Sequence, residues 1–256
     1  MNGILWTFLG TLLTFSVTTL GAAGVFFVKE DAGSRIKSGF LGFAGGVMVA
    51  ASVWSLLLPG IEFAEENGQI SWLVTTGGFL LGVLLLLLAD ELIGRWENLK
   101  VKKDAAMLVA AITAHNIPEG MAIGLAFALA AQNPGNAAFL SGAVALAVGI
   151  AIQNFPEGTA VALPLVQNGV SKKKAFLAGS MSAAVEPVFG VAAAVLAGAV
   201  QKGMPWFLSL AAGAMIYVVV QELIPEACKD KEEEKSGTLG FIVGFLIMMI
   251  LDVALG

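Results

Sequence analysis

The stretch "GFLLGVLLLLLAD" (residues 78–90) carries no charge until its last residue, Asp90. The stretch "GFIVGFLIMMILD" (residues 240–252) repeats its G-F-x-x-G pattern and ends on Asp252 at the equivalent position. The chain as a whole is 57% hydrophobic and 13% charged, with a mean hydropathy of +0.86. This composition is too apolar for a soluble domain of 256 residues. The sequence therefore predicts an integral membrane protein.

Eight blocks of the chain are long and apolar enough to cross a hydrocarbon core about 30 Å thick, which takes roughly 20 helical residues. Strands of a membrane barrel would instead show alternating segments of about 10 residues, and the sequence lacks that pattern. We expect a single all-α transmembrane domain over residues 1–256. Its eight helices are predicted at residues 4–28, 39–61, 70–92, 105–131, 138–167, 175–200, 205–227 and 238–255.

The basic residues predict the orientation of these helices. All of the 14 basic residues except Lys202 fall at the connections that follow the first, third, fifth and seventh predicted helices. Because cytoplasmic loops carry an excess of Lys and Arg, these four connections are predicted to face the cytoplasm. Both termini should then lie outside the cell (inner or plasma) membrane.

The repeated patterns indicate an inverted repeat. The third and eighth helices share the stretch quoted above and run in opposite directions, and the second and seventh share weaker endings at Pro59 and Pro225. "NIPEG" from Asn116 and "NFPEG" from Asn154 form a further antiparallel pair on the fourth and fifth helices. A repeat of helices 1–3 with helices 6–8 around the central pair is typical of alternating-access transporters.

Charged residues inside the predicted helices point to a function. The fourth, fifth and sixth helices carry Glu119, Glu157 and Glu186 within their apolar spans. A charged residue at the centre of a lone helix costs roughly 2.5 to 3.5 kcal/mol on insertion scales. Since no basic side chain lies at that depth, a cation or a proton should offset these carboxylates.

The residues beside the glutamates favour a metal ion. His115, the single histidine of the chain, precedes Glu119 by four residues and so shares its helix face, and Gln153 stands in the same relation to Glu157. Imidazole, carboxylate and amide ligands without a thiolate suit Zn²⁺, Fe²⁺, Mn²⁺, Co²⁺ or Cd²⁺ better than Ca²⁺ or Cu⁺. The alternative for one buried histidine is a hydrogen-bonded core residue.

Proline residues adjoin all three glutamates. Pro118, Pro156 and Pro187 each lack an N–H and clash with the preceding turn, so kinks are predicted there. The carbonyls expected to lose their helical partners belong to Ala114, Ile152 and Ala183. Irregular backbone at this depth is tolerated where it lines a cavity or is buried in protein, and transporters build ion sites on such broken helices.

The motifs HNIPEG, QNFPEG, VEP and ELIPEA, on the fourth to seventh helices, resemble those of the ZIP (Zrt/Irt-like) divalent metal transporters, most closely the bacterial GufA-like branch. The resemblance covers essentially the whole chain. It implies a two-metal transport site, with one metal held by His115, Glu119, Gln153 and Glu157. It places the other metal among Asn116, Asn154, Glu186 and the shared Glu119 and Glu157.

Further expectations come from the same resemblance. It suggests cytoplasmic exit residues at Asp90, Gln221 and Glu222, and a homodimer. This chain departs from many relatives in having Gln153 where they have a second histidine, which bears on metal preference. It also has a short connection after the third helix in place of a histidine-rich loop.

Other classes of function fit less well. A net charge of −5 without a basic face argues against nucleic-acid binding, and the single Cys228 excludes an internal disulfide. A membrane-embedded metallohydrolase normally needs more than one histidine for its zinc, so we expect neither catalytic residues nor a prosthetic group. The transported divalent metal and the lipid bilayer are the expected partners. A metal-selective channel stays open as an alternative to a carrier.

Overall fold

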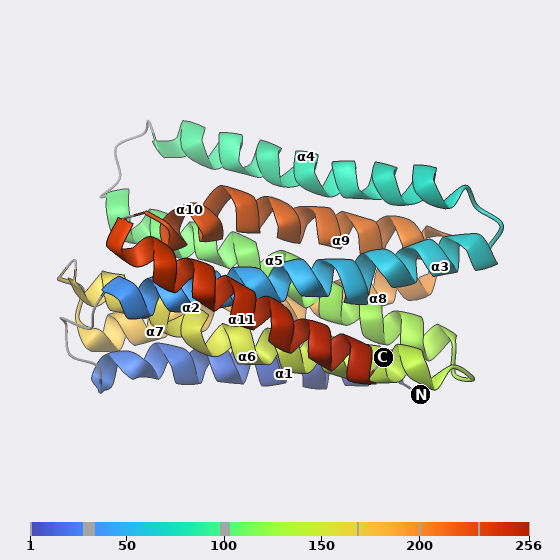
Figure 1. Cartoon of the computed structure of the whole chain (residues 1–256), viewed down its shortest axis with the longest axis horizontal. Helices are drawn as coiled ribbons and strands as arrows, with labels where there is room; N and C mark the ends of the chain where they lie inside the picture. The colour runs from blue at the N-terminus through green and yellow to red at the C-terminus, as the bar shows by residue number, and fades with distance from the viewer. Residues whose placement is uncertain are drawn as a thin grey trace.

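Long apolar runs become helices in a membrane because lipid offers the backbone N–H and C=O groups no partners. The computed structural model describes residues 2–27, 34–97, 103–167, 169–199, 201–229 and 231–255, and this part of the chain is helical without strands (Figure 1). Seven stretches of the described residues are long and apolar enough to cross a membrane. The remaining predicted span corresponds to α5 (Lys103–Gln132), some of whose side chains lie outside the described part. The prediction of an all-α membrane protein is confirmed.

The observed helices follow the predicted order but extend beyond several predicted ends, because helices continue past the apolar core into polar surroundings. The second predicted helix, for example, spans Ser34–Glu66 as α2, a π-helical turn and α3. The sixth is divided into α7 and α8. Besides α5, the elements are α1 (Gly3–Ala22) with η1 (Ala23–Phe26), α2 (Ser34–Ala51), η2 (Ser52–Leu57), α3 (Leu58–Glu66), α4 (Ser71–Glu97), α6 (Ala137–Gln167), α7 (Lys172–Ser182), α8 (Val185–Ala199), η3 (Gln201–Gly203), α9 (Met204–Val218), η4 (Val219–Leu223), α10 (Ile224–Ala227) and α11 (Lys231–Leu255).

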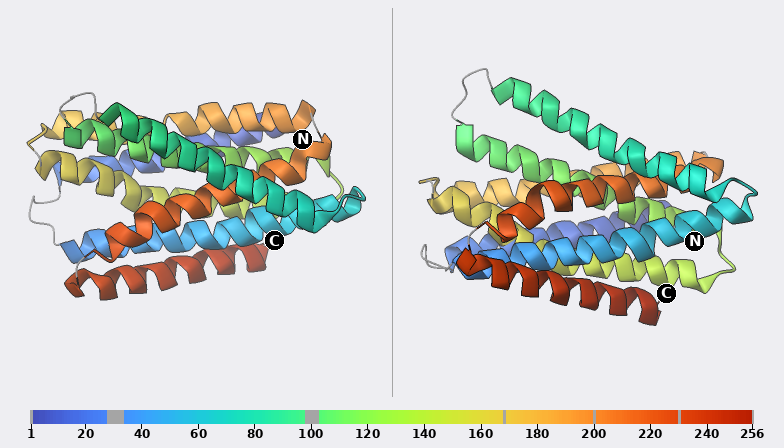
Figure 2. Two further views of the ribbon diagram at one scale, coloured as in Figure 1. Left: turned by 90° about the horizontal axis from the view of Figure 1, so that it is seen from above. Right: turned by 45° about the horizontal axis from the view of Figure 1, so that its top comes forward.

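The packing of the helices follows the inverted repeat. α1 packs against α6 while α5 packs against α8, and α2 packs against α11 while α4 packs against α9. Each pair therefore has its counterpart when the first three predicted helices are exchanged with the last three. α4 lies at the edge of the bundle, beside α9 and α3 (Figures 1 and 2).

Glycine allows each of these four pairs to approach closely. A Cβ atom added at Gly46 of α2 would lie 2.0 Å from the backbone oxygen of Phe241 on α11, and one at Gly82 of α4 would lie 2.0 Å from that of Leu210 on α9. The same added atom at Gly158 of α6 would lie 2.1 Å from the Thr18 oxygen on α1. Small residues give membrane helices the close packing that the hydrophobic effect cannot supply in lipid.

Two π-helical turns occupy equivalent places in the two halves. η2 lies directly before the segment with Pro59, and η4 lies directly before the segment with Pro225. Before η2, the glycines of α2 face α11; after it, a Cβ at Gly60 would lie 3.5 Å from the Leu208 side chain on α9. The helix therefore changes its packing partner across the turn.

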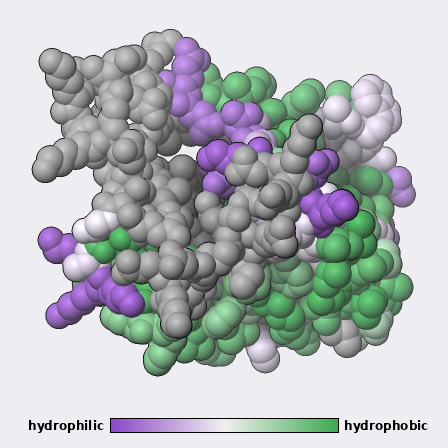
Figure 3. Space-filling model, turned by 60° about the vertical axis from the view of Figure 1, so that its left-hand side comes forward, coloured by the Kyte–Doolittle hydropathy of each residue, from purple (hydrophilic) through white to green (hydrophobic). Residues whose placement is uncertain are grey.

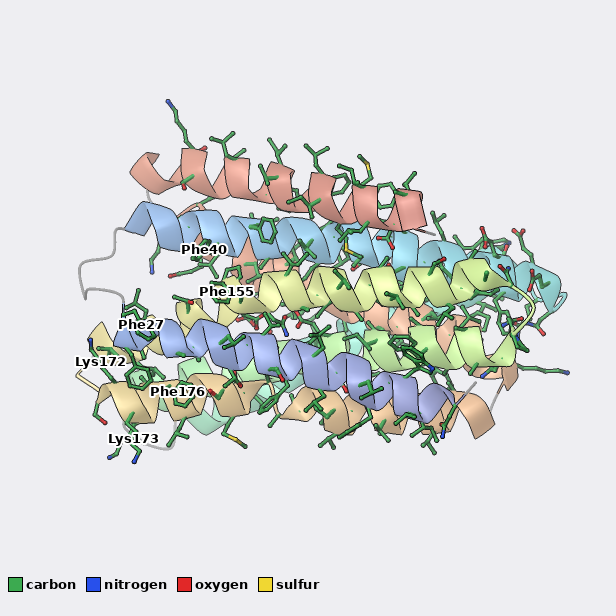
Figure 4. The ribbon with its side chains drawn as sticks, turned by 90° about the horizontal axis from the view of Figure 1, so that it is seen from below. Phe27, Phe40, Phe155, Lys172, Lys173 and Phe176 are labelled. Carbon is green, nitrogen blue, oxygen red and sulfur yellow. The ribbon has the colours of Figure 1, made fainter. Side chains whose placement is uncertain are left out.

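The two ends of the bundle hold different parts of the chain. Both termini lie at one end of the bundle, and the C-terminal ends of α1, α4, α6 and α10 lie at the other (Figure 1). Lys172 and Lys173 project from that second end, beside Phe27 and Phe176 (Figure 4). Hydrophilic residues gather there while the flanks are largely hydrophobic (Figure 3). This arrangement is typical of a bundle that crosses a membrane from end to end.

The α2–α11 contact gives a first prediction. Gly46→Ala should push α11 away from α2 and lower the free energy of unfolding by about 1–3 kcal/mol, because the added methyl meets backbone that cannot rotate away. The measurement is the thermal unfolding midpoint of the purified protein in detergent. Gly142→Ala on α6 is the control, since no described atom lies within 4 Å of its added Cβ. Equal midpoints for Gly46→Ala and wild type would contradict the contact.

Candidate metal site

Polar side chains from three helices meet in the interior of the bundle. Asn116 and Glu119 come from α5, Glu186 comes from α8, and three further residues come from α6. Five of the six are fully buried, and Glu157 is only 8% exposed. The six are Asn116, Glu119, Gln153, Asn154, Glu157 and Glu186. Burial of three carboxylates at membrane depth is what the sequence predicts.

His115 lies on α5 beside Asn116. Its side chain lies outside the described part of the structure, so its place in the site remains a prediction. Helical spacing puts residues 115 and 119 on the same face of α5. The described geometry of the site therefore rests on its carboxylates and amides.

A break in the sixth predicted helix positions Glu186. α7 ends at Ser182 and α8 begins at Val185, so Glu186 lies in the first turn of α8. The positive end of a helix dipole stabilises a carboxylate at this position. The break precedes Pro187, and the Ala183 carbonyl is not left free as expected, because it accepts the Glu186 N–H at 3.0 Å.

The other two prolines leave their helices continuous. α5 runs through Pro118 and α6 runs through Pro156 with helical backbone on both sides. Neither helix is interrupted as the sixth one is. The irregular backbone at this depth is thus confined to the α7–α8 junction among the described helices that contribute to the site.

Amide side chains of α6 hold two of the carboxylates. Nε2 of Gln153 donates to Oε1 of Glu119 at 2.5 Å, which joins α6 to α5. Nδ2 of Asn154 donates to Oε1 of Glu186 at 3.0 Å, which joins α6 to α8. Hydrogen bonds to charged groups stabilise more than neutral ones. The adjacent residues Gln153 and Asn154 therefore connect all three helices.

Thr14 of α1 is a member of this network that the sequence reasoning missed. Its hydroxyl donates to Oε2 of Glu186, and the Thr14 side chain is fully buried. A signal was present in the sequence, because four threonines recur at intervals of three and four residues along one face of α1. They are Thr7, Thr11, Thr14 and Thr18.

Several buried oxygens of the site have no hydrogen-bond partner among the described residues. They are Oδ1 of Asn116, Oε2 of Glu119, Oε1 of Gln153 and Oδ1 of Asn154. Buried polar atoms are otherwise nearly always bonded, so such a group needs an explanation. Carboxylate and amide oxygens of this kind can bind a divalent cation.

The three carboxylates act on one another electrostatically without forming a direct cluster. The charges of Glu157 and Glu186 both act on Glu119. Yet the described residues contain no group of three or more His, Cys, Asp or Glu side chains arranged to hold a metal. Amides stand between the carboxylates instead, so a metal bound here would need amide ligands or a rearrangement of these contacts.

The three suggested exit residues differ in their contacts. Asp90 of α4 accepts a hydrogen bond from the Tyr217 hydroxyl of α9 at 2.6 Å, a contact that the sequence analysis missed. Glu222 also acts on Tyr217 electrostatically, whereas Gln221 is exposed on η4. Asp90 and Glu222 thus share a neighbour, and Gln221 has no described contact with it.

The repeat produces a counterpart of the Asp90 contact at the other end of the bundle. Ser55 of η2 donates to Asp252 of α11 at 2.6 Å. Both residues line a cavity of about 350 Å³ that also contacts Glu62 of α3. In each half, an aspartate near the end of an outer helix is bonded to a hydroxyl from a helix of the other half.

Comparison with known proteins points to one family. The family described as ZIP Zinc transporter matches residues 97–252. The chain is 36% identical to zinc transporter ZIP11 of Homo sapiens, over 100% of this chain and 98% of that protein. It is 34% identical to zinc transporter GufA of Myxococcus xanthus, over 96% and 97% of the two chains. The chain belongs to the ZIP zinc transporter family.

Membership of the ZIP family confirms the resemblance seen in the motifs. It makes this chain a multi-pass membrane protein of metal transport and not an enzyme. Zinc transporter ZIPB of Bordetella bronchiseptica is a further ZIP relative, 36% identical over 97% of this chain and 81% of that protein. The ZIP match includes α5, α6 and α8, which carry the polar side chains described above.

The Gln153–Glu119 contact gives a second prediction. Gln153→Leu should destabilise the metal-free protein by about 1–3 kcal/mol, because Oε1 of Glu119 would stay buried without its donor. The thermal unfolding midpoint in a metal chelator measures this loss. Gln153→His keeps a donor and is the matched control. An unchanged midpoint for Gln153→Leu would show that the contact does not hold Glu119.

Proposed function

We propose that this ZIP protein carries a divalent transition metal, zinc foremost, into the cytoplasm through the polar site on α5, α6 and α8. The observation that supports this most directly is a set of buried carboxylates held by amides and a hydroxyl, beside buried oxygens without described partners. Such a set is costly in a membrane unless a cation uses it. The metal is the cargo, and the proposal requires no prosthetic group.

The proposed site holds two metals. His115, Glu119, Gln153 and Glu157 bind the first, and Asn116, Asn154 and Glu186 bind the second together with the shared Glu119 and Glu157. The Gln153–Glu119 and Asn154–Glu186 contacts support this division, since each joins residues assigned to one metal. The action of Glu157 and Glu186 on Glu119 supports shared carboxylates between the two positions.

The ligand types support the choice of metal. Carboxylate and amide oxygens with one imidazole suit Zn²⁺ and also Fe²⁺, Mn²⁺, Co²⁺ or Cd²⁺. The relatives are zinc transporters by name, which favours Zn²⁺. Gln153 in place of an imidazole supplies one nitrogen ligand fewer, which shifts the site toward harder ions than a two-histidine site would prefer.

Metal uptake into proteoliposomes tests this function. Zn²⁺ uptake should saturate with concentration, as expected for a carrier, and His115→Ala or Glu119→Ala should each reduce it at least about tenfold, since even outer-shell partners of a metal cost 10–100-fold when removed. Gln132→Ala serves as a control for loss of a polar side chain outside the site. Wild-type uptake in both variants would refute the site, and flux linear in Zn²⁺ would indicate a channel.

Orientation is part of the proposal. The end with the four basic connections is assigned to the cytoplasm and both termini to the outside of the cell membrane, in keeping with the distribution of Lys and Arg. A homodimer in the membrane is included on the strength of the family resemblance. The native Cys228 is exposed directly after α10, beside Lys229, which offers a direct probe.

Labelling of intact cells tests the orientation. A membrane-impermeant maleimide should leave Cys228 unlabelled until the cells are opened, because its end of the bundle faces the cytoplasm. The control is Gly135→Cys combined with Cys228→Ser, which puts the thiol in the α5–α6 connection at the opposite end. Labelling of Cys228 in intact cells, with Gly135→Cys protected, would reverse the orientation.

A further inference from the structure

One face of α1 is polar although the helix spans the membrane. Thr7, Thr11, Thr14 and Thr18 are all fully buried, while the opposite face exposes large apolar side chains. Thr11 donates to the Thr7 carbonyl at 2.8 Å and Thr18 donates to the Thr14 carbonyl at 3.1 Å, so both stay within their own helix. Among the described hydrogen bonds of this face, Thr14 alone reaches another helix.

Packing fixes this face against α8. A Cβ added at Gly190 would lie 2.8 Å from the Thr11 methyl group, one turn beyond Glu186. On the other side, a Cβ at Gly120 of α5 would lie 2.5 Å from the Glu186 backbone oxygen. The first turn of α8 is therefore held between α5 and α1, and Thr14 has little freedom to move away from Glu186.

The Thr14 hydroxyl has two acceptors and one hydrogen. Its Oγ1 reaches Oε2 of Glu186 and also lies 2.9 Å from the Thr11 carbonyl oxygen. Oε1 of Glu186 accepts from Asn154. Each oxygen of this carboxylate therefore accepts one donor in the arrangement described, and a cation that approaches Oε2 along the lone pair facing Thr14 competes with that hydroxyl.

We propose that Thr14 is a positioning residue of the transport site, whose hydroxyl holds Glu186 when the site is empty and turns to the Thr11 carbonyl when a divalent cation takes that carboxylate oxygen. The exchange leaves neither the hydroxyl nor the carboxylate without a partner. The polar groups are thus bonded in both the empty and the loaded site, which a carrier needs because it switches between outward-open and inward-open states in both forms. This inference rests on the proposed role of Glu186 as a ligand of the second metal.

Removing the hydroxyl should strengthen metal binding. In Thr14→Val the shape is kept, but a bound cation no longer has to displace a charge-assisted hydrogen bond. Affinity for the second metal should rise roughly tenfold, which is the scale of such a bond. Release should slow in proportion, so that KM and the maximal uptake rate both fall. A general loss of packing would raise KM instead.

The experiment measures Zn²⁺ binding stoichiometry and affinity in detergent and uptake kinetics in proteoliposomes for three variants. Thr14→Val is expected to bind tighter and turn over more slowly, whereas Thr14→Ser keeps the hydroxyl and should match wild type. Thr18→Val removes a buried hydroxyl that bonds only to its own helix and is the control. Unchanged or weaker binding in Thr14→Val, or the same effect in Thr18→Val or Thr14→Ser, overturns the proposal.

The Glu186→Gln variant distinguishes an error in the role of Thr14 from an error in the second metal position. It should lower the stoichiometry from two metals toward one and abolish the additional effect of Thr14→Val in the double variant. If Glu186→Gln still binds two metals at wild-type affinity, the second metal position is wrong and the inference fails with it. If Glu186→Gln loses a metal but Thr14→Val binds as wild type does, only the role of Thr14 is refuted.

Discussion

Three carboxylates buried in one membrane bundle must each find a donor or a cation, and this requirement shapes the surrounding structure. In the described part of the chain, the hydrogen-bond donors to Glu119 and Glu186 are amides and a hydroxyl rather than basic side chains. Each partner comes from a different helix than the carboxylate that it serves. Four helices are therefore tied together at one depth by the same groups that make the site costly to build.

Close helix packing makes this arrangement reachable. Glycine brings α5 close to α8 at Gly120 and α6 close to α1 at Gly158, so the four helices that contribute to the polar network lie near one another. Gly120 lies next to Glu119, so one residue of "PEG" brings α8 near while its neighbour supplies the carboxylate. The repeated motif thus combines a proline without an N–H, a buried carboxylate and a packing position within three residues.

Much of the architecture could be predicted because hydropathy and charge are local properties of the sequence. The helices, their inverted pairing and the buried glutamates all follow from apolar runs and from repeated motifs. The spacing of the α1 threonines indicates a polar face, but the partner of Thr14 could not be predicted, because it depends on which helix packs beside that face. The break before Glu186 occurs where Pro187 predicts a kink, but the sequence did not show that the helix would be interrupted there and not at Pro118 or Pro156. His115 remains a prediction from spacing.

The π-helical turns η2 and η4 each allow one long helix to pack against two different neighbours. A π turn accommodates an extra residue, and each residue of an α-helix advances the side chains by about 100°. The small residues before η2 therefore point to α11, while Gly60 beyond it points to α9. η4 changes the packing partner in the other half in the same way, since α9 packs on α4 while α10 packs on α2. The two π turns, related by the repeat, thus rotate the side-chain direction of both long helices and connect the outer helices to one another. Deleting one residue from either turn would rotate the contacts on one side of it away from their partners.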